Sequence, residues 1–235
     1  MVYGELGRYP MEIQIKTRMI TYCLRLINGK DKKYAKLLYE LGFKLQQENR
    51  GNIGWFENIK SILNHSGLSN IWLEQTTHST KWLKAKIKLT LTDQFKQNWQ
   101  STVQSSPKGL NYRLYKDELK LENYFNVLSK KDAITLCRFR ICNHHLPIES
   151  GRWVNIPRNE RICNHSNNKQ EIGDEFHYIL NCTSLQQERV KYLTLYHTKI
   201  KNVFSFKQIM ANDKHCLLKK LCCFIRKINQ MCSPI

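Results

Sequence analysis

Apolar residues recur at helical spacing through the first third of the chain. From position 13 to 27 they step by three, four or seven residues, and Asn28-Gly29 ends the pattern. Asp31 is placed to cap a second stretch, and a polar turn over 49–54 precedes a third. Each stretch predicts a helix that buries its apolar stripe. The stripes are Ile13, Ile20, Leu24 and Ile27; Tyr34, Leu37, Leu38, Leu41 and Leu45; and Trp55, Ile59, Ile62 and Leu63.

The pattern over residues 81–103 fits two kinds of structure. Residues 84–92 alternate with period two, which is typical of a strand, whereas the apolar residues of the longer window step by four, which is typical of a helix. No Gly or Pro interrupts the longer window, so its length favours a helix that ends before Pro107 and Gly109. The residues that step by four are Leu83, Ile87, Leu91, Phe95 and Trp99.

The rest of the chain divides by periodicity. One helical stretch carries Leu119 and Leu128, and another begins after a capping Ser129. Periodicity lapses over 143–182, where His, Cys, Arg and Asn become frequent, and it returns over 184–228. The sequence therefore predicts a mainly α chain, a helical linker or bundle with a small irregular insert and C-terminal helices. Its four predicted segments are 1–75, 76–142, 143–183 and 184–235.

Length and composition exclude several classes of protein. The chain has 235 residues, enough for one domain or two small ones. No run approaches the ~18–20 apolar residues that span a bilayer, and the first residues lack the pattern of a secretory signal. Nine cysteines, an odd number, favour reduced thiols, some of them buried or on a metal. We therefore expect a nuclear or cytoplasmic protein that does not engage a membrane.

Charge points to a polyanionic partner. Lys and Arg number 38 and Asp and Glu 19, a net charge of +19. Such an excess repels itself unless a polyanion neutralises it, and RNA or DNA does so through its phosphates. Residues 76–131 hold 11 basic and 4 acidic residues beside several tyrosines, and Lys84, Lys86 and Lys88 are candidate nucleic-acid contacts. A merely basic protein with solvated helix faces is the alternative.

One short segment has the residues of a metal site. Cys163, His165, His177 and Cys182 lie within 20 residues, and zinc prefers four thiolate or imidazole ligands. A zinc knuckle begins Cys-x2-Cys, but position 166 is Ser, so His165 is the candidate fourth ligand. An irregular polar loop is the alternative. Cys142, His144 and His145 lie further upstream and are minor candidates for the ligand set.

No catalytic constellation is visible in the sequence. Asp174 and Glu175 are adjacent, so on regular structure they point in different directions, and no Asp-Asp pair occurs. Phosphate-binding loops and nucleophile elbows are absent as well. We therefore expect no enzymatic activity from this chain by itself and no small-molecule substrate.

The motifs together resemble a known family. Residues 137–153 read CRFRICNHHLPIESGRW, residues 156–163 read IPRNERIC, and residues 174–182 read DEFHYILNC. This order resembles the segment downstream of the polymerase domain in reverse transcriptases of non-LTR (LINE-like) retrotransposons. The pattern there is roughly R-x-x-x-H-x-L-x-I-E-x-G-R, then R-x-C-x-x-C, then D-E-x-H-x-x-x-x-C. Residues 3–10 and 99–124 also look like that stretch, so the resemblance covers most of the chain.

The resemblance implies a mostly helical accessory tail that binds nucleic acid and ends in a zinc knuckle. By position, Cys163, His177 and Cys182 match metal ligands, and Ser166 replaces the remaining Cys. The polymerase core is missing, so we expect a fragment or a truncated copy of a longer reading frame. Four arginines match motif positions and are candidate phosphate contacts, although Arg152 has an alternative role in pairing with Glu149 or Glu160. The four are Arg140, Arg152, Arg158 and Arg161.

Two functions follow from these expectations. The first is an accessory tail that holds template RNA or target DNA for an RNA-directed DNA polymerase. The alternative is a structural remnant of a decayed retroelement reading frame that binds nucleic acid only non-specifically.

Overall fold

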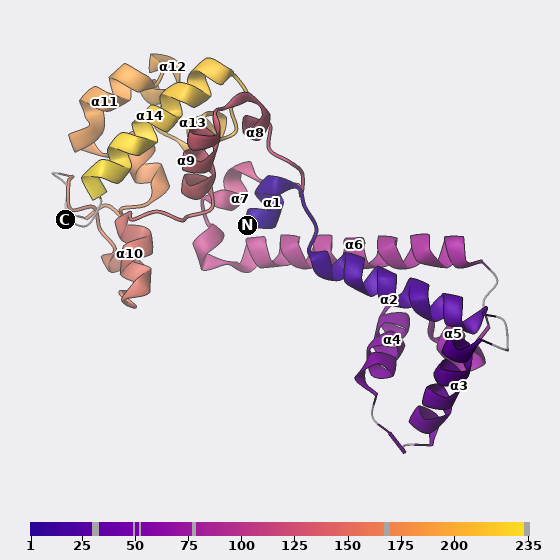
Figure 1. The fold of residues 1–235 in the computed structure, drawn as a ribbon. Helices are drawn as coiled ribbons and strands as arrows, with labels where there is room; N and C mark the ends of the chain where they lie inside the picture. Colours follow the sequence, from indigo (N-terminus) through magenta and orange to yellow (C-terminus); the bar gives the residue numbers. More distant parts are fainter. Residues whose placement is uncertain (30–32, 49, 52, 77–78, 167–169, 233–235) are drawn as a thin grey trace. The chain divides into compact units, whose positions relative to one another are not determined.

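The chain is mainly α-helical, as the hydrophobic pattern predicts. The computed structural model describes residues 1–29, 33–48, 50–51, 53–76, 79–166 and 170–232. Within these ranges the elements are helices and two isolated bridges, with no strands (Figure 1). None of the described helices combines the length and the apolar character that crossing a bilayer requires. Asp31, expected to cap a helix, lies outside the described residues.

Two compact units make up the chain, and they do not follow the four predicted segments. Unit 2 is Tyr9–Asn98, and unit 1 combines Met1–Arg8 with Trp99–Ile235. The predicted boundary at 75/76 lies inside unit 2, and those at 142/143 and 183/184 lie inside unit 1. The first eight residues join unit 1 through contacts with residues more than a hundred positions away, which local periodicity does not reveal.

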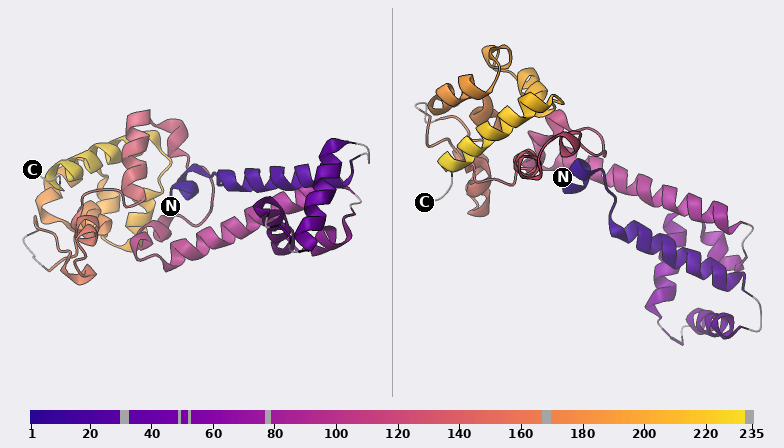
Figure 2. Two further views of the ribbon diagram at one scale, coloured as in Figure 1. Left: turned by 60° about the horizontal axis from the view of Figure 1, so that its bottom comes forward. Right: turned by 45° about the horizontal axis from the view of Figure 1, so that its top comes forward.

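Unit 2 is a small bundle of helices (Figure 2). The helix α6 covers the ambiguous window 81–103, so the helical interpretation of that window is confirmed. Most of the predicted apolar residues are buried in one core, in which Ile20, Leu24 and Ile59 are almost fully covered. The helices are α2 (Met11–Ile27), α3 (Tyr34–Gln47), α4 (Gly54–His65), α5 (Ser69–Glu74) and the first part of α6 (Thr80–Ser105).

The apolar stripe predicted on α3 is exposed instead of buried. Tyr39 and Gly42 are the buried residues of this helix. A Cβ on Gly42 would lie 2.7 Å from the Phe56 ring, so the missing side chain lets α3 approach α4 closely. This packing turns the opposite face outward. Its members are Tyr34, Leu37, Leu38 and Leu41, which are 48–85% exposed.

Unit 1 holds the remaining helices, and its C-terminal helix α14 packs on α8, α9 and α11 (Figure 1). Ser129 caps α9 by accepting from the amide of Asp132, as predicted. The α-helices are α1 (Val2–Leu6), α7 (Tyr112–Tyr115), α8 (Tyr124–Val127), α9 (Lys130–Arg140), α10 (Pro147–Trp153), α11 (Gln186–Tyr192), α12 (Leu195–Lys199), α13 (Val203–Met210) and α14 (His215–Cys232). Short turns are η1 (Pro107–Gly109), η2 (Arg158–Glu160), η3 (His177–Asn181) and η4 (Thr183–Leu185).

Two stretches of unit 1 differ from their predicted structure. The chain between α7 and α8 is not helical, because Leu121 pairs with Leu6 and the Glu122 amide donates to the Glu5 carbonyl at 3.0 Å. The stretch 143–182, expected to be irregular, contains the helix α10. Pro147 begins that helix, a position that proline suits because its missing N–H is not needed there.

Candidate functional site

A hairpin positions Cys163, the first of three buried side chains that lie close together. Ile162 and Ile172 form an antiparallel bridge. The Cys163 amide donates to the Glu171 carbonyl at 2.9 Å, and the Gly173 amide donates to the Arg161 carbonyl at 2.8 Å. The segment therefore folds back on itself, and residue 171 lies opposite residue 163.

A short π-helical turn positions His177 and Cys182. The turn is preceded by Asp174, whose Oδ1 accepts from the His177 amide at 2.9 Å and so caps this helical segment. The Cys182 amide then donates to the His177 carbonyl at 2.8 Å, a bond that spans five residues. This closure brings two side chains that an α-helix would separate onto the same side.

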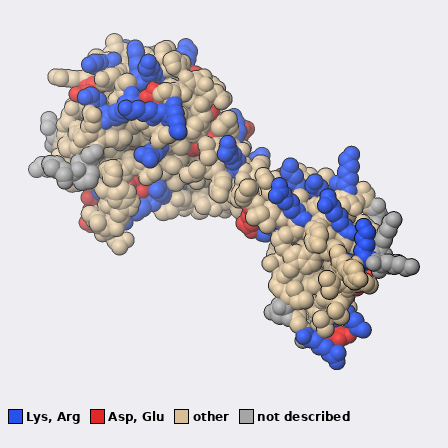
Figure 3. Space-filling model, in the orientation of Figure 1, with Lys and Arg blue, Asp and Glu red and all other residues tan. Residues whose placement is uncertain are grey.

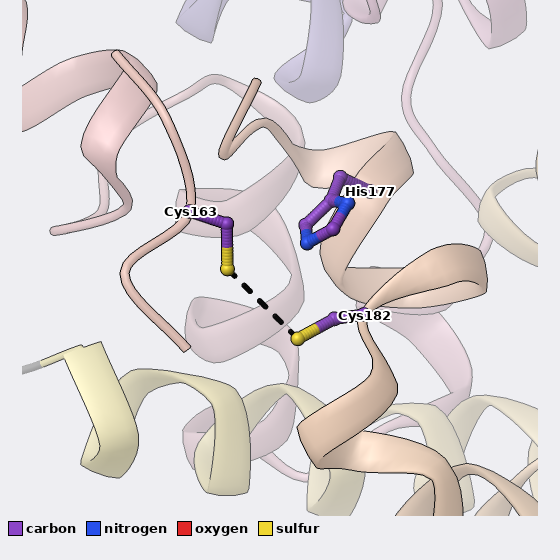
Figure 4. Close-up of side chains that lie close together, drawn as sticks. All are labelled: Cys163, His177 and Cys182. Carbon is purple, nitrogen blue, oxygen red and sulfur yellow. Dashed lines mark hydrogen bonds between the residues drawn. The ribbon is translucent and has the colours of Figure 1, made fainter. Parts of the chain in front are cut away.

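The three side chains converge in the interior of unit 1 (Figure 4). The ligand atoms of Cys163, His177 and Cys182 all lie within 4.8 Å of one another, and each residue is at most 3% exposed. The two sulfur atoms are 3.9 Å apart, so both cysteines are free thiols. This group could hold a metal ion, and it consists of three of the four ligands that the sequence predicts.

Neither buried nitrogen of the His177 imidazole has a hydrogen-bond partner among the described residues. The two nitrogens differ in their surroundings, because Nδ1 lies 3.0 Å from Glu171 Oε2. Figure 4 shows a ring nitrogen directed toward the two sulfur atoms. A carboxylate behind one imidazole nitrogen and an unpaired second nitrogen in front is the usual arrangement of a metal-binding histidine.

The two thiols influence each other's protonation. Their mutual contact lowers the pKa of Cys163, and the neighbouring side chains of His177 and Tyr178 act in the same direction. The same contact and burial raise the pKa of Cys182. The Tyr178 hydroxyl is 3.4 Å from Cys163 Sγ. One thiolate of the pair is stabilised by the neighbouring thiol, and a metal ion that binds both sulfur atoms displaces both protons.

Arg189 stabilises the turn that carries two of the three candidate ligands. It is 1% exposed, and its guanidinium donates to the carbonyls of Ile179 at 2.9 Å and Cys182 at 2.8 Å. These carbonyls lie where the π-helical turn ends, and the Cys182 carbonyl also accepts from the Leu185 amide at 3.3 Å. No role for Arg189 follows from the sequence, because only the folded turn shows which carbonyls its guanidinium reaches.

His165 is not part of the group. Its side chain is exposed, and its backbone carbonyl accepts from the Ser184 hydroxyl. The structure therefore does not place His165 as the fourth ligand, because the hairpin leaves residue 165 exposed. Ser166 is buried instead, with its Oγ 3.5 Å from Glu171 Oε2. Glu171 itself was missed, although a hairpin prediction over 163–171 would have placed it beside the site.

A second buried group contains Cys142, His144 and Glu175. Their ligand atoms also lie within 4.8 Å of one another, so the group could hold a metal ion. His144 Nε2 is 2.7 Å from Glu175 Oε1, and the Cys142 thiol is 3.2 Å from the Lys108 carbonyl. Hydrogen bonds from His144 and Asn111 outweigh burial and lower the pKa of Glu175 to about 2. The Cys142 thiol, His144 Nε2 and Glu175 Oε1 already have hydrogen-bond partners, unlike Nε2 of His177.

Arg140 lies in the interior, which contradicts its predicted contact with nucleic acid. It is 1% exposed, its Nε is 2.9 Å from Glu5 Oε2, and its Nη2 is 2.9 Å from Glu122 Oε2. The rings of Tyr115 and Tyr124 pack on the same guanidinium. Two carboxylates and two aromatic faces surround the charge, so no phosphate can reach it.

The other three motif arginines are held by protein groups. Arg161 donates to the carbonyls of Ile156 at 2.8 Å and Ile148 at 3.1 Å. Arg152 pairs with Glu149 at 3.0 Å, the alternative that the sequence left open, and Arg158 lies 3.6 Å from an Asp174 oxygen. Arg152 and Arg158 remain 27% and 38% exposed at their side chains. They shape the segment around α10, and their phosphate contacts stay a prediction.

Lys84, Lys86 and Lys88 have the exposure that their predicted role requires. All three lie on α6 and are exposed. Figure 3 shows Lys and Arg side chains gathered over the part of unit 2 where α2 and α6 lie. No ion pair joins these three lysines to a carboxylate among the described residues.

No known protein family, curated protein or solved structure matches the chain.

Proposed function

We propose that the chain is an accessory module that holds RNA or DNA, of the kind that its motifs resemble in LINE-like reverse transcriptases. The observation that carries the proposal is the surplus of cations in both units. Residues 9–98 hold 15 Lys and Arg against 7 Asp and Glu, and the other residues hold 23 against 12. Each unit alone therefore carries enough positive charge to bind a nucleic-acid backbone through counterion release.

The distribution of acidic groups strengthens this surplus at the surface of unit 1. Glu5, Glu149 and Glu175 are at most 3% exposed. They neutralise interior or half-buried cations, and they contribute little to the field at the surface. Fewer carboxylates therefore remain at the surface to match the exposed lysines and arginines, although Lys120 pairs with Glu118 and Arg158 with Asp174, and this imbalance favours a polyanionic partner.

Zinc is the metal that best fits the group of Cys163, His177 and Cys182. Two thiolates and an imidazole are its preferred ligands. Zn–S bonds of about 2.3 Å in a tetrahedron separate two sulfur atoms by about 3.8 Å, and the observed separation is 3.9 Å. We infer that zinc joins the hairpin to the π-helical turn, and that it serves the stability of unit 1.

Nucleic-acid binding is tested by the salt dependence of affinity for a labelled single-stranded RNA. The double variant Lys84→Gln/Lys88→Gln removes two unpaired charges. The matched control Lys44→Gln/Arg50→Gln removes two charges that pair with Glu48. We expect the slope of log K against log salt to fall by about 2 in the first variant and less in the control. Absence of binding by the wild type at low salt, or an affinity that salt does not change, overturns the proposal.

Zinc binding is tested separately by mass spectrometry under non-denaturing conditions. We expect one zinc ion per chain in the wild type and none in His177→Ala. A chain purified with zinc present that carries no metal would show that the group is only a hydrogen-bonded cluster, and this result would leave the test of nucleic-acid binding unaffected.

A further inference from the structure

A polar pocket opens in unit 1 between α9, α14 and the chain that follows α9. Its volume is about 410 Å³. Eight residues line it, two of them arginines and two histidines, and none of them is acidic: Ile134, Thr135, Arg138, Asn143, His144, His145, Arg226 and Asn229. Figure 3 shows Lys and Arg side chains over the surface where α9 and α14 lie in Figure 1.

The two arginines of the pocket differ in their ion pairing. Arg226 is 2.5 Å from Asp132 Oδ1, which fixes its guanidinium at the wall of the pocket. Arg138 is exposed and has no ion-pair partner among the described residues. An unpaired guanidinium beside a fixed one presents several N–H donors to an anion, and phosphate is the anion whose geometry such a fork matches.

One ring at the pocket wall packs against a second, exposed ring outside the pocket lining. His145 is exposed and lines the pocket, and the Trp153 ring packs edge-on against His145 with centroids 5.5 Å apart. Trp153 is 57% exposed, so a face of its ring is accessible to a partner. Cationic grooves with exposed aromatic rings are how proteins bind single strands, because bases stack on the rings while the backbone follows the charges.

We propose that this pocket is a binding site for single-stranded nucleic acid, in which a backbone phosphate lies against Arg138 and an adjacent base stacks on Trp153. The inference rests on the proposed function and locates it in unit 1. It also explains why the pocket contains cations and amides without a carboxylate. The motif arginines around α10 then have a different role, since they hold the helix whose last residue is Trp153.

The test compares two variants that remove different parts of the same site. Affinity of the full chain for a labelled oligouridylate is measured from about 50 to 200 mM salt. Arg138→Gln removes a phosphate contact, so the slope of log K against log salt falls by about 1. Trp153→Leu removes a stacking platform, so affinity falls about fivefold or more at every salt concentration while the slope is unchanged.

A matched control and a direct readout complete the test. Lys130→Gln removes an exposed charge from the first turn of α9, outside the pocket, and is expected to change affinity less than Arg138→Gln. Circular dichroism checks that all variants fold, and ultraviolet crosslinking of the wild type should attach RNA to a peptide that contains Trp153. Wild-type binding that both pocket variants retain in full overturns this inference alone. A wild type that binds no RNA overturns the proposed function as well.

Discussion

Glu5 and Arg140 form a buried ion pair across 135 positions of sequence. Arg140 Nε is 2.9 Å from Glu5 Oε2, and both residues are at most 1% exposed. The Tyr124 hydroxyl contacts the same carboxylate. The pair links α1 to the end of α9, so the first residues of the chain belong to the core of unit 1.

Removing the charge of Glu5 is expected to destabilise unit 1 strongly. Glu5→Gln leaves the Arg140 guanidinium buried with Glu122 as its only remaining carboxylate among the described partners. Breaking a buried pair from one side costs about 3–5 kcal/mol in the free energy of unfolding. Chemical denaturation followed by circular dichroism measures this loss. The exposed Glu12→Gln, which breaks a surface pair with Lys16, is the control and is expected to cost less than about 1 kcal/mol. Equal losses in both variants would contradict the structural role of the pair.

Arg161 is expected to matter for stability and not for nucleic-acid binding. Its guanidinium donates to two carbonyls, and a Cβ on Gly151 would lie 2.7 Å from its Cγ. Lysine lacks the fork that makes both bonds, so Arg161→Lys should lower the free energy of unfolding by about 1–3 kcal/mol.

The control for this prediction is Arg158→Lys. Within the described part of the chain, the only ion pair of Arg158 is a 3.6 Å contact with Asp174, so we expect a smaller loss of stability. RNA affinity, measured where both variants are folded, should equal that of the wild type for Arg161→Lys. A loss of RNA affinity without a loss of stability would show that Arg161 contacts the nucleic acid.

The sequence predicted which segments are helical better than it predicted which faces are buried. The helix over 81–103 follows from apolar residues four apart, a local signal. The exposed face of α3 does not follow from such a local signal. Gly42, and not a leucine, decides how closely that helix approaches Phe56. Short helices such as α10 were missed because their residues serve packing with distant segments.

For the candidate metal site, too, the sequence identified some residues correctly and others wrongly. Spacing and resemblance identified Cys163, His177 and Cys182, whereas His165 was proposed from sequence proximity alone and points outward. Arg140 illustrates the opposite error. Its charge suggested a surface role, and its partner Glu5 lies too far away in sequence for any local pattern to reveal.

Acid should weaken the contact between α9 and α14 through Asp132. Hydrogen bonds from Arg226 and Ser129 lower the pKa of Asp132. A carboxyl whose folded pKa is lowered stabilises the fold above its unfolded pKa of about 3.9, and that contribution is lost as pH falls through the folded value. We expect the free energy of unfolding to decline below about pH 4.

Asp132→Asn tests this assignment by denaturation at several pH values. The variant should be less stable than the wild type at pH 7 and should show a smaller decline below about pH 4. Asp213→Asn, an exposed substitution, is the control and should keep the wild-type profile. If the free energy of unfolding of Asp132→Asn declines at low pH as steeply as that of the wild type, other carboxyl groups cause the decline.

Glu171 is expected to position His177 for metal. Its Oε2 lies 3.0 Å from Nδ1, which leaves Nε2 to face the sulfur atoms. Glu171→Gln weakens this orientation, and such changes typically lower metal affinity about 10- to 100-fold. Competition with a chromogenic chelator measures zinc affinity. Glu160→Gln, an exposed change in the same segment, should leave it unaltered.

Ser166→Cys should convert a three-ligand group into a four-ligand zinc site. Ser166 is buried on the same hairpin, and its Oγ is 3.5 Å from the carboxylate that contacts His177. A thiolate is a far better zinc ligand than a hydroxyl that stays protonated. We expect tighter zinc binding and a higher melting temperature, with the increase abolished by EDTA. The same substitution made together with His177→Ala should show neither gain. If zinc binds Ser166→Cys but not the wild type, the native group lacks the affinity to hold zinc with three ligands. If zinc binds neither protein, residues 163–182 do not form a zinc site.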